Sequence, residues 1–108
     1  MPDEIDRTDI ELFRQARSGN REAYGALIRG YQQRIFILCY SYLSDYHKAE
    51  DLTQETFVKF YESIRRIRDP EKFYYYMLVI AKNLCINELN KKKPITDIWS
   101  EESRLMRG

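Results

Sequence analysis

Residues 48–60 read KAEDLTQETFVKF, and the spacing of side chains in and after this stretch decides the fold. Residues that can be buried recur every three or four positions, which is the period of an α-helix with one face in the core. They are Ala49, Leu52, Thr53, Thr56, Phe60, Ile64 and Ile67. At about 100° per residue, a second set shares a direction away from the core: Asp51, Gln54, Glu55 and Val58. The stretch predicts a helix with a buried stripe on one side and an acidic docking surface on the other.

Two helices are predicted before this stretch. Thr8 and Glu11 have the spacing of a capping box, so a short, peripheral first helix is expected over residues 9–18. Asn20 can cap the longer helix that follows. The apolar positions of this second helix keep one rhythm without a break: Tyr24, Leu27, Ile28, Tyr31, Ile35, Leu38, Cys39 and Tyr42. The pattern therefore predicts one continuous helix that ends before Asp45, which can cap the next.

A fourth helix is predicted after Asp69 and Pro70, which can supply its cap and its first position. Its expected inner face comprises Phe73, Met77, Ile80, Ala81 and Leu84. Residues 94–108 follow a proline and have the composition of a linker, or of a short helix that needs a partner for Trp99. The sequence thus predicts an all-α fold, a compact bundle of three long helices plus one short N-terminal helix.

The composition indicates one soluble domain. The chain has 108 residues, of which 44% are hydrophobic and 32% charged, as expected for a folded protein with a single core. The acidic N-terminus lacks the features of a signal peptide, and the longest mainly apolar stretch, residues 35–43, is too short to cross a bilayer. We expect a cytoplasmic protein without membrane insertion, in which Cys39 and Cys85 are reduced core thiols.

An enzyme is one interpretation of the acidic stretch, with Asp51 and Glu55 as an acid–base pair. Their predicted exposure argues against it, because a general acid needs burial or a like charge to tune its pKa. His47 has no second metal ligand beside it, and the chain has no glycine-rich phosphate loop. The sequence therefore predicts no catalytic residue, no metal site, no cofactor and no small-molecule substrate.

Basic and aromatic residues gather around the turn before the fourth helix. Arg65, Arg66, Arg68 and Lys72 precede four consecutive aromatic residues, Phe73 to Tyr76. Four adjacent side chains on a helix point in four directions, so only one or two can share the core. Cations beside exposed rings suit single-stranded DNA, because phosphates need charge and unstacked bases need a flat apolar surface. The alternative is that the tyrosines pack on neighbouring helices with their hydroxyls in water, and spacing alone does not separate the two.

Two runs of sequence, DYHKAEDLTQETFVKFYESI and FYYYMLVIAKNLCINELNKKK, resemble the second conserved region of bacterial sigma factors, in the extracytoplasmic-function (ECF) group of the sigma-70 family. The resemblance covers about residues 8–93. It rests on three pieces in the same order: the A-E-D-L-x-Q-E-x-F core, the F-x-x-x-L/M-x-x-I-A-x-N-L run and the basic end. It implies a region 2 domain over residues 1–93 and an interdomain linker or tail over residues 94–108.

The resemblance implies two binding surfaces and no catalysis. In this group the first of the three pieces contacts the clamp helices of core RNA polymerase, and the corresponding residues are Asp51, Gln54, Glu55, Phe57 and Val58. The turn and the last helix read the promoter −10 element on the nontemplate strand. The corresponding DNA-binding residues are Arg65, Arg66, Arg68, Lys72, Tyr75, Tyr76, Lys82, Asn83, Asn87, Lys91, Lys92 and Lys93.

Within the DNA-binding set, the resemblance implies different tasks. The loop from Arg66 to Lys72 would hold one flipped base. Asn83, paired with Lys82, would contact a base edge, since an amide offers a donor and an acceptor together. The lysines at 91–93 would meet phosphates, which adds affinity without sequence information. The alternative for Asn83 is that its amide only bonds to the neighbouring loop and shapes the pocket from behind.

Two departures from the family pattern limit what is carried over. The family often has Trp where Tyr76 stands and a basic residue where Val79 stands, and its members have a second, helix-turn-helix domain that this chain does not contain. We expect the chain to be a fragment that ends in the linker. The rival interpretation is a helical module that binds only proteins. An anti-sigma factor is an expected partner in either case, whereas the Lys82–Asn83 pair favours DNA binding.

Overall fold

The structure is a computed structural model and describes residues 5–91. Five α-helices are present in this part of the chain: α1 (Arg7–Arg17), α2 (Arg21–Arg29), α3 (Gln32–Leu43), α4 (Tyr46–Ser63) and α5 (Phe73–Lys91). Two short 3₁₀ turns, η1 (Ile64–Arg66) and η2 (Pro70–Lys72), connect α4 to α5. Residues 5–91 contain no strand, so the all-α prediction is confirmed.

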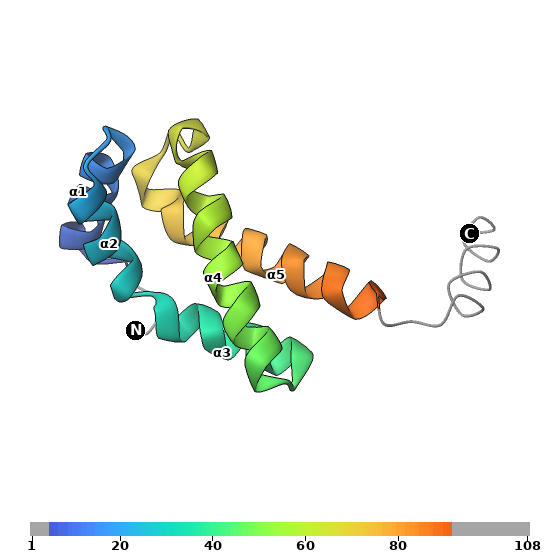
Figure 1. The fold of residues 1–108 in the computed structure, drawn as a ribbon. Coiled ribbons are helices and arrows are strands. Elements are labelled where there is room, and N and C mark those ends of the chain that lie inside the picture. The colour runs from blue at the N-terminus through green and yellow to red at the C-terminus, as the bar shows by residue number, and fades with distance from the viewer. Residues whose placement is uncertain (1–4, 92–108) are drawn as a thin grey trace, which may run out of the picture.

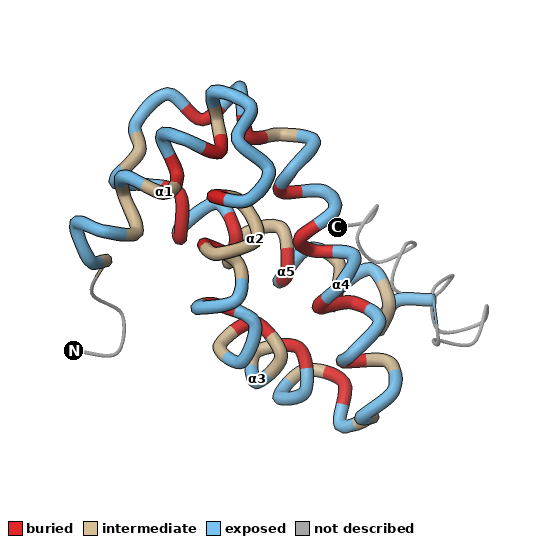
Figure 2. The backbone as a smooth tube through the Cα atoms, turned by 60° about the vertical axis from the view of Figure 1, so that its left-hand side comes forward, coloured by how far each residue is buried: buried red, intermediate tan, exposed pale blue. Residues whose placement is uncertain are grey.

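The helices pack in two groups that share one core. α1 and α2 form a pair at one end, while α3, α4 and α5 pack against one another at the other (Figure 1). Every helix has both buried and exposed positions along its length (Figure 2). Lys48 Nζ lies 2.8 Å from Glu88 Oε2, which joins the first turn of α4 to the last turns of α5. The start of α4 is therefore joined to the end of α5 by an ion pair, and the end of α4 is joined to the start of α5 by the loop that contains η1 and η2.

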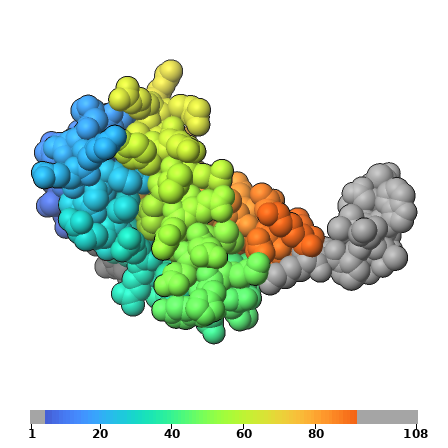
Figure 3. Space-filling view, viewed as in Figure 1, coloured from blue at the N-terminus to red at the C-terminus, as the bar shows by residue number. Residues whose placement is uncertain are grey.

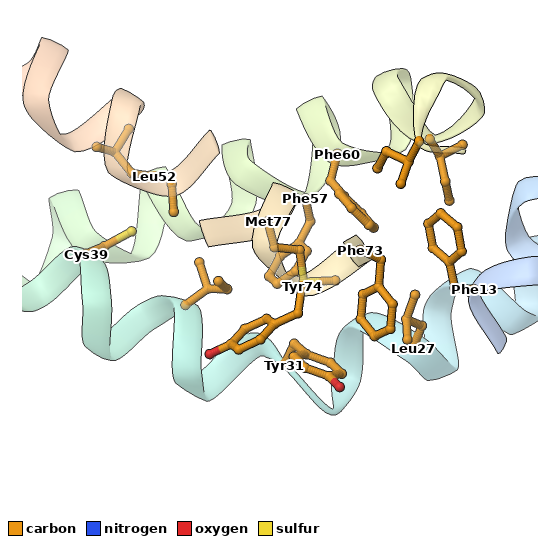
Figure 4. Packing of buried hydrophobic residues seen from close by; sticks show 14 of the residues in the cluster. Phe13, Leu27, Tyr31, Cys39, Leu52, Phe57, Phe60, Phe73, Tyr74 and Met77 are labelled. Atoms are coloured by element: carbon orange, nitrogen blue, oxygen red, sulfur yellow. The ribbon is translucent and has the colours of Figure 1, made fainter. Parts of the chain in front are cut away.

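A cluster of aromatic rings forms the centre of the core. The ring of Phe13 lies 5.5 Å from that of Phe73, nearly parallel to it, and 6.2 Å from that of Phe60 (Figure 4). Tyr31 packs edge-on against Phe73 at 5.4 Å. All four side chains are at most 1% exposed. The first helix, predicted to be peripheral, therefore contributes a central residue of the core.

The buried stripe of the opening stretch is confirmed. All seven of its residues are buried in the structure, from Ala49 to Ile67. Asp45 caps α4 as predicted, since its Oδ1 accepts a hydrogen bond from the Lys48 backbone N–H at 3.1 Å. The preceding residue, Ser44, has a left-handed backbone with φ 53°, which turns the chain sharply between α3 and α4. The helical part of the stretch ends at Ser63, and the last two stripe residues lie in and after η1.

The prediction of one continuous second helix is wrong. The helix breaks between α2 and α3, where the backbone N–H groups of Gly30 and Tyr31 donate to carbonyls three residues back instead of four. The bend lets the Tyr31 hydroxyl donate to Asp9 Oδ2 on α1 at 2.7 Å while its ring stays buried. Burial, and then the bond to Asp9, raise the pKa of Tyr31. Glycine has a low helix propensity, and the apolar rhythm continues through the bend, so periodicity alone does not reveal it.

The starts of α1 and α5 differ from the predicted ones. The prediction of a capping box at Thr8 and Glu11 is wrong. Asp6 is the cap, since its Oδ1 accepts a hydrogen bond from the Thr8 backbone N–H at 3.2 Å, and the helix begins at Arg7. An acid two residues earlier can satisfy the free donors at a helix start. Asp69 does cap the turn before α5, accepting from the Glu71 N–H at 3.0 Å, but that first turn is 3₁₀ rather than α-helical. Residues 94–108 lie outside the described residues.

The two cysteines are confirmed as free core thiols. Cys39 on α3 and Cys85 on α5 are fully buried. Burial, and then the neighbouring Cys39, raise the pKa of the Cys85 thiol to about 12. A thiol with so high a pKa is a poor nucleophile at neutral pH. None of the helices within residues 5–91 has the length and hydropathy needed to span a bilayer.

Candidate functional site

The outer side of α4 is acidic and largely unpaired. Asp51, Gln54, Glu55 and Val58 are all exposed, as the helical spacing predicts, and Val58 is 57% exposed. Glu62 extends this surface along the helix, and Glu50 lies to one side of it, at the groove. We call the four acids the acidic crest: Glu50, Asp51, Glu55 and Glu62. None of the four forms an ion pair within residues 5–91. The crest therefore carries a negative charge that a cationic partner could neutralise.

A groove runs beside the crest, between α4 and the broken helix pair α2–α3. Its larger part has a volume of about 530 Å³ and is lined mainly by apolar side chains: Tyr24, Ile28, Phe57, Val58 and Tyr61. A second part, of about 340 Å³, continues it toward Phe36 and Glu50, and both parts share Gln32, Thr53 and Gln54. Figure 3 shows α4 across the front of the molecule, with α2 and α3 along one edge of it. An apolar floor with an acidic rim is the arrangement that binds a basic amphipathic helix.

Phe57, which the resemblance assigns to polymerase binding, lies deeper than the other residues of that set. It is only 5% exposed, so it forms the floor of the groove and part of the core. The Tyr24 hydroxyl donates to the Phe57 backbone carbonyl and fixes α2 against α4 at this point. The Tyr24 ring also packs edge-on against Tyr61 at 4.8 Å. Burial, and then the neighbouring Tyr61, raise the pKa of Tyr24, so this hydroxyl stays protonated and can donate.

Tyr24 and Ile28 are functional candidates that the sequence did not reveal. Both belong to the apolar rhythm of the second helix, where they are indistinguishable from core residues. In the structure they are half-buried and form one wall of the groove. Only the packing of α2 against α4 identifies them.

The loop between α4 and α5 presents its cations outward. Ile64 and Ile67 are buried, whereas Arg65, Arg66 and Arg68 are exposed, so the loop is anchored by its isoleucines. A second anchor comes from α1. The guanidinium of Arg17 donates through Nη1 to the carbonyls of Ile67 at 2.8 Å and Arg68 at 2.9 Å. The same guanidinium lies 5.4 Å from the centre of the Phe13 ring.

Replacing this anchor tests how the loop is held. Arg17→Met keeps the apolar stem but removes both hydrogen bonds, so it is expected to lower the free energy of unfolding by about 2 kcal/mol. Arg14→Met is the matched control, since Arg14 is 55% exposed and its single ion pair, to Glu11, is 3.9 Å long. Urea unfolding of both variants measures the difference. Equal losses in the two would show that the loop does not depend on Arg17.

The four consecutive aromatic residues divide between core and surface. Phe73 and Tyr74 are buried, while Tyr75 is 61% and Tyr76 40% exposed, with the two exposed ring centres 5.7 Å apart. The prediction that only one or two of them can share the core is confirmed. A hollow of about 470 Å³ next to Tyr75 is lined by Glu71 and Lys72 from η2, by Tyr74 and Leu78 from α5, and by Ile5.

Of the remaining predicted DNA-binding residues, three share one face of α5, Lys82, Asn83 and Asn87, and Lys91 lies just beyond the edge of that face. Lys82, Asn83, Asn87 and Lys91 are all exposed. At about 100° per residue, positions 75, 76, 79, 82, 83, 86, 87 and 90 fall within an arc of about 140°, so they form one continuous surface, which we call the α5 face. The Asn83 amide makes no hydrogen bond within residues 5–91, so no bond to the neighbouring loop supports the alternative role for it. Lys92 and Lys93 lie outside the described residues.

The acidic and imidazole side chains of the described part of the chain do not gather into a metal-binding cluster. Residues 5–91 contain no group of three or more potential metal-binding side chains. His47 is exposed on the first turn of α4, beside the ring of Tyr46. Asp51 and Glu55 are solvated carboxylates on the acidic crest.

Comparisons with known proteins agree with this geometry. Residues 27–95 match the family described as sigma-70 region 2. The chain is 36% identical over 82 residues to the ECF RNA polymerase sigma factor SigW of Bacillus subtilis, covering 76% of this chain and 44% of that protein. It is 28% identical to the RNA polymerase sigma-H factor of Pseudomonas aeruginosa, with 93% of this chain and 53% of that protein covered.

A third relative gives the same picture. The chain is 31% identical to the ECF RNA polymerase sigma-E factor of Haemophilus influenzae, over 89% of this chain and 52% of that protein. The chain thus spans about half the length of these relatives. No solved structure matches it significantly.

Proposed function

Because this chain belongs to the sigma-70 region 2 family, we propose that it is the promoter-recognition domain of an ECF sigma factor, binding core RNA polymerase on one face and the promoter −10 element on another. The observation that carries the proposal is the separation of two chemically different surfaces on adjacent helices. One is the acidic crest with its apolar groove on α4, and the other is the α5 face. The domain comprises residues 1–93, and residues 94–108 are the linker.

The crest and the groove suit the clamp helices of the polymerase. From Glu50 to Glu62 the groove follows α4 for about 18 Å, at about 1.5 Å per residue. A helix lying in it would place apolar residues on Phe57 and Val58, with flanking cations close to Asp51 and Glu55. An anti-sigma factor that covered the same groove would block polymerase binding, which makes this surface the place for such a partner to act.

The α5 face suits the nontemplate strand after melting. Tyr75 and Tyr76 provide rings on which unstacked bases can stack, worth about 1–3 kcal/mol per base. The hollow between Lys72 and Tyr75 is large enough for a base, with a cation at its rim for the adjoining phosphate. Asn83 lies in the middle of the face, between the tyrosines and Lys91. The proposal includes no catalytic step, because both surfaces act by binding.

The isolated domain should prefer single-stranded −10 DNA to the same sequence as a duplex. Stacking requires exposed base faces, which a duplex hides, and the cations neutralise phosphates in either form. The logarithm of the binding constant for the single strand should fall with the logarithm of salt concentration, with a slope of about −0.7 per phosphate contacted. Fluorescence anisotropy over a salt series measures both quantities. Equal affinity for the two forms would contradict base capture.

A pair of variants separates base reading from general attraction to DNA. Asn83→Ala should reduce discrimination between the cognate −10 element and a single-base variant by about 1–3 kcal/mol, the usual value of one good base contact. Lys91→Ala should weaken binding to both oligonucleotides about equally, because a phosphate contact carries no sequence information. Competition titrations with both oligonucleotides measure the difference. If Asn83→Ala weakens every oligonucleotide by one factor, or none, direct readout by this amide is wrong.

A further inference from the structure

Two aliphatic side chains of α5, Val79 and Ile86, have no part in the core of residues 5–91. Ile86 is 37% exposed, and Val79 is half-buried without packing against the core cluster. The other aliphatic residues of the helix are buried or packed against that cluster: Leu78, Ile80, Ala81, Leu84 and Leu89. Packing within the domain therefore does not explain why positions 79 and 86 are apolar.

The α5 face consists of two rows of side chains that run side by side along the helix. At about 100° per residue, positions 75, 79 and 86 share one direction, and positions 83, 87 and 90 share another, about 60° away. We call the first set the apolar row: Tyr75, Val79 and Ile86. We call the second set the amide row: Asn83, Asn87 and Asn90. One row can form hydrogen bonds with a ligand, and the other can only offer it apolar contact.

The two aliphatic side chains flank Asn83. Val79 precedes it by four positions and Ile86 follows it by three, and side chains with these spacings are neighbours on a helix, with Cβ atoms about 5–6 Å apart. The Asn83 amide makes no hydrogen bond within residues 5–91, so it is available to a ligand. A base whose edge meets this amide would therefore have an aliphatic group on the side of each neighbouring base.

The charge and chemistry of the face favour one kind of occupant for the apolar row. Lys82 is exposed between Val79 and Ile86 along the helix, and a cation at this position suits a phosphate backbone better than an apolar protein surface. Among the four standard bases of DNA, thymine alone carries a methyl group, and apolar side chains distinguish it by contact with that methyl. Thymine in single-stranded DNA is therefore the ligand that fits this row.

We propose that Val79 and Ile86 read the 5-methyl groups of thymines next to the base that Asn83 contacts. This role rests on the proposed function and adds a base preference to the α5 face. Single exposed apolar residues are common on protein surfaces, but these two share a row with the exposed ring of Tyr75 and flank an amide that is free to bond. The amide row then reads a polar base edge, and the apolar row selects thymine over cytosine beside it.

Deoxyuridine differs from thymidine only in lacking the 5-methyl group, so it tests this role directly. Replacing the thymines of the cognate single-stranded −10 element one at a time should lower the affinity about three- to fourfold at one position or more, the usual effect of one buried methyl-sized group. The double variant Val79→Ser with Ile86→Ser should bind the thymine and deoxyuridine strands equally. Ile37→Ser is the matched control, because it removes a 57% exposed aliphatic side chain from α3 and should keep the discrimination. Fluorescence anisotropy measures each affinity.

Three outcomes would overturn the role of the apolar row. They are equal affinity of the unaltered domain for every thymine and deoxyuridine pair, unchanged discrimination in the double variant, and a cognate −10 strand that contains no thymine. In each case, a retained preference for the single strand over the duplex would leave the proposed function intact, whereas loss of that preference in the unaltered domain would overturn both. Far-UV circular dichroism checks that the double variant is folded, and Ile86→Ser alone, a change outside the core, serves if it is not.

Discussion

Reversing two charges on the acidic crest, Asp51→Lys with Glu55→Lys, is expected to weaken binding to core RNA polymerase by about a hundredfold or more. Like charges placed against one another at an interface cost several kcal/mol, and each 1.4 kcal/mol is about tenfold in affinity. Both side chains are exposed and unpaired within the described residues, so stability should change by no more than about 0.5 kcal/mol. A pull-down with core polymerase and a thermal melt of the same protein measure the two quantities.

The control is a second charge reversal of the same size elsewhere. Glu11→Lys with Glu22→Lys alters two exposed acids on α1 and α2, away from the crest. If this control weakens polymerase binding as much as the crest variant, the effect is one of net charge and not of the crest. If neither variant weakens binding, the assignment of α4 to the polymerase is wrong, whereas the DNA-binding experiments with α5 would stand unaffected.

Phe73→Ala is expected to lower the free energy of unfolding by about 3–5 kcal/mol, the usual cost of removing a buried phenylalanine. Phe73 is fully buried and contacts the rings of Phe13 and Tyr31, so its loss opens a cavity where α1, the α2–α3 bend and α5 meet. A loss of this size is a large part of the stability of a domain of this length, typically about 5–15 kcal/mol. Urea denaturation followed by circular dichroism measures it.

Tyr75→Ala is the matched control for the core variant. It removes an aromatic ring two positions further along the same helix, where the side chain is 61% exposed. It should change the free energy of unfolding by no more than about 0.5 kcal/mol. It should, however, clearly lower the affinity for single-stranded DNA. Similar destabilisation by both variants would mean that the division of the aromatic run between core and surface is wrong.

The features that the sequence predicts well are those that repeat with the period of a helix. The buried stripe from Ala49 to Ile67 is correct at every position, and the exposure of Asp51 and Glu55 follows from the same geometry. The division of the tyrosines after Phe73 also follows, because four neighbouring side chains cannot face one core. Local chemistry adds the caps at Asp45 and Asp69. These inferences need only neighbours within a few turns.

The features that the sequence does not reveal depend on contacts between distant segments. The bend at Gly30 is stabilised by the Tyr31 hydroxyl bonding to Asp9, more than 20 residues away. Arg17 holds the loop carbonyls of Ile67 and Arg68 from across the fold, and no local pattern distinguishes it from other surface arginines. The groove likewise exists only because α2 packs against α4. Such contacts have no period, so a pattern search along the chain cannot find them.

Because α4 and α5 are held in a fixed relation, the affinity of α5 for DNA can be low. The two helices are joined by Lys48 and Glu88 at one end and by an anchored loop at the other, so a partner that holds α4 also fixes the position of α5. Under the proposed function, DNA brought to the polymerase would meet α5 at a high effective concentration, and the second contact would become intramolecular. Modest affinity for free DNA would therefore suffice, and would keep the unattached domain from occupying promoters by itself.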